Sequence, residues 1–261
     1  MRSTHCQSAM RLSFGMKPDR NLQDRQRDER LLNRRVFLKN GIIFSGAALA
    51  GAGLRGADTA KSSDEKKAEV GPPEDLMREH GVLKRVLLIY GEALRRLDAK
   101  QDFPPEALAD AAGIIRRFVE DYHEKLEEDF LFPRFEKANQ LVDLVKVLRT
   151  QHEAGRRVTD VTMRFANLQS LRSESERTQL VNSMQQFIRM YNPHEAREDT
   201  VLFPAFRKIV SPHEFDSLGE DFEKKEDELF GEDGFEKMVD KVAGIEKRFG
   251  IYDLAQFTPK I

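Results

Sequence analysis

Two stretches of the sequence, HEKLEEDFLFPRF at 123–135 and HEAREDTVLFPAF at 194–206, each place a glutamate four residues after a histidine. The pairs are His123 with Glu127 and His194 with Glu198, and they recur 71 positions apart (194 − 123). Positions i and i+4 project from the same face of an α-helix, so each pair can approach one cation from one side. Imidazole suits Fe, Zn, Cu and Ni, and carboxylates can bridge two cations. These stretches therefore predict a duplicated metal-binding unit.

A second pair of segments belongs to the same repeat, because LMREHGVLKRV at 76–86 matches LRTQHEAGRRV at 148–158. Each half of the repeat thus supplies two histidines and one carboxylate, a set that favours non-haem iron and oxygen chemistry when coordination positions stay open. Burying these groups without a cation would cost several kcal/mol for each unpaired charge. The predicted metal ligands are His80, His123, Glu127, His152, His194 and Glu198.

Apolar residues recur at spacings of three and four along most of the chain, as the series Leu76, Leu83 and Leu87 illustrates. This periodicity predicts amphipathic helices, and the predicted ligands lie on their apolar stripes. Four such helices, turned inward, can assemble both ligand sets in one bundle core. We therefore predict an all-α fold, with a four-helix up-down bundle over 74–210 and extra C-terminal helices over 211–261, one opening at Ser211 and another spanning 234–248.

Two local features bear on the fourth helix of this bundle. Ser173 and Glu176 have the spacing of a capping box, which predicts that the helix starts there. Pro193 directly precedes His194, and a proline inside a helix removes a hydrogen bond and clashes with the preceding turn. The sequence therefore predicts a kink, or a locally re-formed helix, beside a metal ligand.

The N-terminal segment differs in character from the rest of the chain. Arg34 and Arg35 precede the apolar run GIIFSGAALAGAGL at 41–54, and together they resemble a twin-arginine export signal. The run of 14 residues is shorter than the roughly 20 that cross a bilayer, so no stable membrane span is expected in the mature form. We predict a leader over 1–57, a flexible linker over 58–73 and a periplasmic protein; an uncut anchoring helix is the alternative.

The single cysteine and the charge distribution exclude several classes of function. Cys6 lies in the predicted leader, so the mature chain would have no thiolate metal site and no disulfide. Residues 1–57 hold 11 Lys+Arg and 4 Asp+Glu, which leaves 32 basic against 41 acidic residues in the remainder. Nucleic-acid binding needs clustered Lys and Arg, and an acidic body with no basic stripe argues against it.

The order His, His-x-x-x-Glu, His, His-x-x-x-Glu over four helices resembles the hemerythrin or HHE cation-binding family, over residues 74 to about 210. The resemblance implies a non-haem di-iron cofactor that meets small diatomic or peroxide ligands. It implies that His80 and His123 hold one iron, that His152 and His194 hold the other, and that both glutamates bridge them.

One departure from the family pattern concerns the residue one turn after His152. Oxygen-carrying members have a fifth histidine there, and this chain has Arg156. The resemblance therefore implies a more symmetric iron pair, reacting with oxygen, nitric oxide or peroxide rather than carrying oxygen reversibly. Glu124, Glu153 and Glu195 are further carboxylates near the histidines, but each is offset about 100° around an ideal helix.

Three other classes of protein fit the residues less well. A ferritin-like iron oxidase or store requires Glu-x-x-His on two helices. Glu120 supplies this once, but Tyr191 occupies the second position. A zinc peptidase requires His-Glu-x-x-His, which neither copy matches. A purely structural or interacting helical module of the cell envelope stays open, and metal content distinguishes it from the di-iron prediction.

Overall fold

The computed structural model describes residues 71–260, and this part of the chain is helical with no strand. The predicted leader over 1–57 and almost all of the predicted linker lie outside the described residues, as do Cys6 and the paired arginines. The prediction of an all-α fold is confirmed for the described part.

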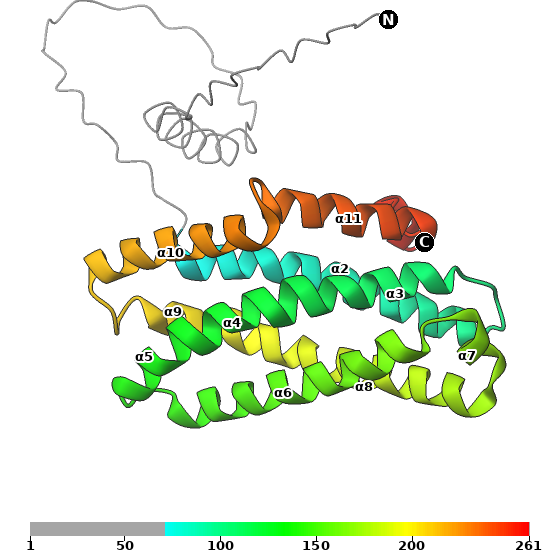
Figure 1. The fold of residues 1–261 in the computed structure, drawn as a ribbon, viewed down its shortest axis with the longest axis horizontal. Helices are drawn as coiled ribbons and strands as arrows, with labels where there is room; N and C mark the ends of the chain where they lie inside the picture. Colours follow the sequence, from blue (N-terminus) through cyan, green and yellow to red (C-terminus); the bar gives the residue numbers. More distant parts are fainter. Residues whose placement is uncertain (1–70, 261) are drawn as a thin grey trace, which may run out of the picture. The chain divides into compact units, whose positions relative to one another are not determined.

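Four helical arms run side by side with alternating direction, which Figure 1 allows the reader to follow from α2 to α9. The first arm is α2 (Pro72–Asp98), and the third is α6 (Val142–Phe165). The second arm runs without a break through α3 (Pro105–Ile114), η1 (Ile115–His123), α4 (Glu124–Leu126), η2 (Glu127–Leu131) and α5 (Phe132–Lys137). After the short α7 (Leu168–Arg172), the fourth comprises α8 (Glu174–Arg197), η3 (Glu198–Leu202) and α9 (Phe203–Phe206).

The core of the bundle is built from the apolar stripes that the sequence places on each arm. Tyr90, Leu108, Leu148 and Phe187 come from the four arms in turn, and each is at most 1% exposed. Burying a side chain of the size of leucine or phenylalanine stabilises a fold by about 1.5 to 3 kcal/mol. The predicted metal ligands sit on the same stripes, so packing of the arms draws them together.

Three segments, η1, η2 and η3, are π-helices, in which each hydrogen bond spans one residue more than in an α-helix. Both η2 and η3 end at a leucine that is followed by Phe-Pro, so Pro133 and Pro204 lie just beyond the wide turns. Proline has no N–H to donate and crowds the carbonyl one turn earlier, which favours widening there. In η2, the carbonyl of Glu128 accepts a hydrogen bond from Nη2 of Arg149 at 3.3 Å, where Pro133 has no N–H to offer.

The sequence predicts a kink or a re-formed helix at Pro193, but the change in helical pattern lies five residues later, at Glu198. The α-helix continues through this proline as far as Arg197, and the regular pattern changes only at Glu198, where η3 begins. The predicted helix start is present, since the hydroxyl of Ser173 accepts from the backbone N–H of Glu176 at 3.5 Å. In the fourth arm, the irregular backbone therefore begins at Glu198 rather than at the proline beside His194.

The C-terminal residues form α10 (Pro212–Phe230), α11 (Gly234–Arg248) and a 3₁₀ turn, η4 (Leu254–Phe257). Helices α10 and α11 pack on the outside of the bundle against α2, α3 and η1 (Figure 1). The guanidinium of Arg85 holds α11 to α2 through two bonds to Glu246, at 2.8 and 2.6 Å. Among the described helices, none combines the length and the hydropathy that a bilayer crossing requires.

Candidate metal centre

The six predicted ligands meet in the middle of the bundle as two groups. The first metal group consists of His80, His123 and Glu127, and the second metal group consists of His152, His194 and Glu198. In each group, one ligand atom from every residue lies within 4.8 Å of the others, and all six residues are buried. The first metal group comes from the first two arms of the bundle, and the second comes from the last two.

Each glutamate also reaches the histidines of the other group. Glu198 places Oε1 at 3.1 Å from Nε2 of His194 and Oε2 at 3.5 Å from Nε2 of His80. Glu127 places Oε1 at 3.9 Å from Nε2 of His123 and Oε2 at 3.4 Å from Nε2 of His152. Both carboxylates therefore lie between the two groups, each with one oxygen toward either side.

Five of the polar atoms that face this centre lack hydrogen-bond partners. Within residues 71–260, both oxygens of Glu127, both oxygens of Glu198 and Nε2 of His123 are buried without one. Leaving a buried polar group unpaired costs about 1 to 3 kcal/mol, and more if it is charged. A cation between the imidazole nitrogens and the carboxylate oxygens would satisfy all of them, so the residues present fit a metal ion.

The pKa shifts of two of the histidines favour metal ligation, whereas those of His80 and Glu127 favour the protonated groups. Burial lowers the pKa of His123 and of His152, which keeps these imidazoles neutral and their lone pairs free for a metal. Burial and the nearby charge of Glu198 raise the pKa of Glu127 well above its usual range. Burial also opposes the charged form of His80, but the contacts with Asp199 and Glu198 outweigh it and raise the pKa of His80 to about 9.

Each of the four imidazoles is held by an oxygen on the side away from the centre. Asp199 lies 2.8 Å from Nδ1 of His80, Glu79 lies 2.8 Å from Nδ1 of His123, Glu128 lies 3.1 Å from Nδ1 of His152, and Gln151 lies 2.8 Å from Nδ1 of His194. We call these four residues the outer partners. A hydrogen bond donated by Nδ1–H fixes the tautomer and the orientation of the ring, which leaves Nε2 free to face a metal.

Sequence reasoning missed the outer partners, although the repeat contains the information. Glu79 and Gln151 stand 72 residues apart (151 − 79), and Glu128 and Asp199 stand 71 apart (199 − 128), which are the offsets of the ligands themselves. Glu79 and Gln151 immediately precede the ligands His80 and His152. Glu128 and Asp199 immediately follow the ligands Glu127 and Glu198. Aligning the two halves one residue to either side of each ligand brings these four into register, together with Glu124 and Glu195, which are not outer partners.

The phenylalanine of each Leu-Phe-Pro sequence, at 131–133 and at 202–204, packs on a histidine of the other half. Phe203 stacks on His80 with ring centroids 5.6 Å apart, and Phe132 stacks on His152 with ring centroids 5.5 Å apart. The aromatic faces shield these imidazoles from water. The two halves of the repeat thus interlock through their bridging glutamates, through Glu128 and Asp199, and through these phenylalanines.

Arg156 occupies the position of the fifth histidine of oxygen-carrying hemerythrins. Its guanidinium points at carboxylates rather than at the metal groups. Its Nη2 lies 2.8 Å from Glu124 and 2.8 Å from Glu128. Glu124 also accepts a 2.5 Å hydrogen bond from the hydroxyl of Tyr191. The absence of a side chain at Gly155 makes room for that hydroxyl, because a Cβ there would overlap it.

The three weaker carboxylate candidates belong to neither metal group. Glu153 is exposed, and Glu195 is buried and paired with Lys84. Glu124 lies close to Glu128 and His152, in a cluster that Arg156 neutralises from one side. Their roughly 100° offset from the ligands thus directs them away from the centre, as an ideal helix predicts.

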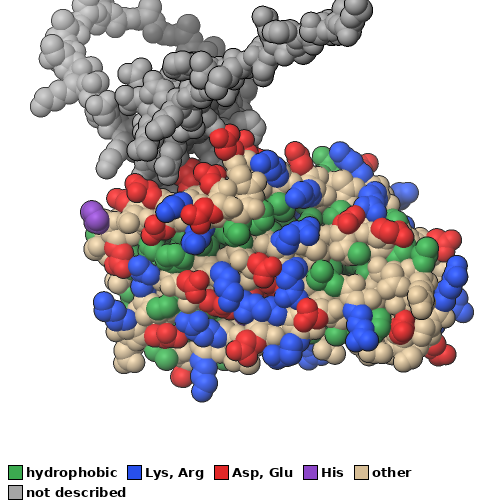
Figure 2. All heavy atoms as spheres, viewed as in Figure 1, with side chains coloured by type: hydrophobic (Ala, Val, Ile, Leu, Met, Phe, Trp, Pro, Cys, Tyr) green, Lys and Arg blue, Asp and Glu red, His purple; other side chains and the backbone are tan. Residues whose placement is uncertain are grey.

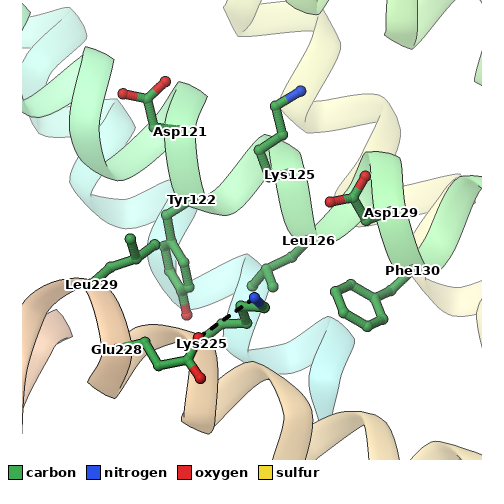
Figure 3. Close-up of a pocket in the computed structure, with 9 residues that line it drawn as sticks. All are labelled: Asp121, Tyr122, Lys125, Leu126, Asp129, Phe130, Lys225, Glu228 and Leu229. Carbon is green, nitrogen blue, oxygen red and sulfur yellow. Dashed lines mark ion pairs between the residues drawn. The ribbon is translucent and has the colours of Figure 1, made fainter.

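A surface pocket of about 260 Å³ lies between the second arm and α10, and none of the six predicted ligands lines it (Figure 3). Lys225 and Glu228 of α10 form an ion pair at its edge, and the ring of Tyr122 forms part of its wall. The hydroxyl of Tyr122 hydrogen-bonds to Glu79, the outer partner of His123. The pocket is therefore separate from the centre but is linked to it through two side chains. Around it, acidic and basic side chains are interspersed over the face that Figure 2 draws.

Comparisons with known proteins agree with this geometry. A family model described as the hemerythrin HHE cation binding domain matches residues 72–206. Two relatives, an uncharacterized protein of Mycobacterium tuberculosis (strain ATCC 25618 / H37Rv) and one of Mycobacterium bovis (strain ATCC BAA-935 / AF2122/97), are each 53% identical over 195 residues. The match covers 75% of this chain and 76% of each relative. No solved structure matches the chain.

Replacing His123 with alanine should remove metal and lower stability, because Glu79 loses its imidazole partner and Glu127 loses its neighbour in the same group. We expect a loss of about 1 to 3 kcal/mol in the free energy of unfolding, together with reduced metal content. Elemental analysis and denaturant unfolding measure the two effects.

The matched control for this variant is His213→Ala, since His213 is exposed at the start of α10. It should change stability by less than about 0.5 kcal/mol and leave the metal content unchanged. Equal damage from the two substitutions would show that the histidines are wrongly divided between site and surface.

Proposed function

The chain belongs to the hemerythrin HHE cation-binding domain family, and we propose that it is an exported non-haem di-iron protein whose metal pair binds or reacts with oxygen, nitric oxide or peroxide. One observation carries the proposal. Both Glu127 and Glu198 direct one oxygen toward each metal group, which is the arrangement that two cations bridged by two carboxylates require.

In this proposal the six buried residues divide into terminal and bridging ligands. His80 and His123 hold one iron, His152 and His194 hold the other, and the two glutamates are shared. Iron in such a site supplies redox chemistry and an open position for a small ligand. The chain itself orients the imidazoles through the outer partners and excludes water with Phe132 and Phe203.

The ligand set favours iron over metals that prefer sulfur, because it contains only imidazole and carboxylate. It also argues against a ferritin-like store. Glu120, the residue that would complete one Glu-x-x-His motif, is paired with Arg116 at 3.1 Å, and Tyr191 donates to Glu124. Neither side chain belongs to a metal group.

Arg156 supports reaction rather than reversible carriage of oxygen. A guanidinium has no lone pair to donate, and the contacts of this one with Glu124 and Glu128 engage it away from the centre. Three side chains in each group, with the carboxylates shared, would leave coordination positions at two bound metals for an exchangeable ligand.

Freshly purified mature protein should contain close to two irons per chain, because two complete ligand sets are present. Elemental analysis of protein from iron-replete cells measures the ratio. Stoichiometric zinc without iron would contradict the di-iron proposal, and a protein free of metal would favour a structural module of the cell envelope.

Oxidation should outrun carriage. When the protein is reduced without air, exposed to oxygen and then placed under vacuum, we expect the reduced optical spectrum to return only in part, because the open positions at both metals admit oxidant. Full recovery over many cycles would contradict this expectation and would indicate a reversible carrier.

Export is the remaining part of the proposal, and the paired arginines support it. We expect the protein in the periplasmic fraction, trimmed near residues 50 to 57, and we expect Arg34→Lys with Arg35→Lys to retain it in the cytoplasm. Immunoblots of cell fractions measure size and location together. A full-length chain in the membrane fraction would instead support an uncut anchor.

A further inference from the structure

The outer partners break the symmetry of the two metal groups at one position. Three of the four offer a carboxylate, but the fourth, Gln151, offers a neutral amide to His194 at 2.8 Å. Its counterpart in the first half is Glu79, a buried carboxylate at the same 2.8 Å from His123. The two halves therefore present the same geometry with different groups, a carboxyl in the first and an amide in the second.

The remaining two outer partners increase this difference. Glu128, the partner of His152, is already neutralised by Arg156 at 2.8 Å and by an ion pair with Lys125. Asp199, the partner of His80, pairs with no lysine or arginine within residues 71–260, and the same holds for Glu79 there. Within the described residues, the two carboxyl groups that support the first metal group thus have no lysine or arginine partner, whereas the second metal group is supported by an amide and by a carboxylate paired with Arg156 and Lys125.

The chemical effect of an outer partner on a metal ligand is known in general terms. A carboxylate that accepts from Nδ1–H makes the imidazole a stronger donor at Nε2, and loss of such a partner typically weakens metal binding by about 10- to 100-fold. A neutral amide fixes the ring but adds no charge. Burial strengthens the effect of Glu79, because little solvent screens its contact with His123, whereas Asp199 is 36% exposed.

We propose that the two metal positions are unequal and fill in order: the first metal group binds its cation first and more tightly, with Glu79 and Gln151 as the positioning residues that set the difference. The inference rests on the proposed di-metal function. It means that a chain carrying a single cation holds it between His80, His123 and Glu127.

The repeat provides a matched exchange to test this order, because Glu79→Gln and Gln151→Glu change charge with almost no change in shape. Metal-free mature protein is titrated with Co²⁺ in calorimetry against a competing chelator. The natural chain should show two steps whose dissociation constants differ by about 10- to 100-fold. Each single substitution should bring the two steps together, one by weakening the first and the other by tightening the second.

The doubly exchanged chain, Glu79→Gln with Gln151→Glu, should again show separate steps but in reversed order. Anomalous X-ray scattering from crystals prepared with one equivalent of Co²⁺ identifies the occupied group in each protein. Gln179→Glu, at an exposed position of α8, adds the same charge far from the centre and should leave both steps unchanged.

Two equal steps in the natural chain, or a first ion between His152, His194 and Glu198, would overturn the inference. Uptake that stops at one equivalent would instead overturn the proposed di-metal function. The crystallographic position of that single ion would still decide which group is preferred, so the two failures are distinguishable.

Discussion

The burial of two carboxylates and four imidazoles at the centre of a helical bundle is the constraint on which the rest of the structure depends. Polar groups of this kind are stable in a core only when they are paired with a cation or with hydrogen-bond donors. The bundle meets the demand from both sides. It brings the bridging glutamates between the histidines, and it provides each imidazole with an oxygen partner behind it.

The C-terminal helices also contribute to the surroundings of one of the two metal groups. Helices α10 and α11 cover α2, α3 and η1, which belong to the first half of the repeat. Glu226 of α10 lies near enough to Glu79 for its charge to raise the pKa of that carboxyl, after burial itself. The extension therefore contributes to the surroundings of the first metal group.

The sequence predicted the helical class and the six clustered residues because both follow from spacing. Residues such as His123 and Glu127 share a helix face whatever the remainder of the chain does, and the second copy supports the first. The π-helical turns η2 and η3 were not predicted, since they depend on how Pro133 and Pro204 act on an otherwise regular helix. Pro193, by contrast, is accommodated without a break. The direction of Arg156 also could not be predicted, because it depends on where the second arm brings Glu124 and Glu128.

The interlocking of the halves has a consequence for how the centre is assembled. Each half is a helical hairpin whose glutamate and phenylalanine serve the histidines of the other, so the arrangement is that of a dimer of hairpins joined in one chain. The junction is the turn at 138–141, in which Asn139 and Leu141 adopt left-handed backbone angles with φ of 52° and 51°. A connection this short gives the second hairpin an effective concentration in the millimolar range or above next to the first. The centre can therefore be completed within a single molecule at any dilution, which two separate hairpins could not achieve.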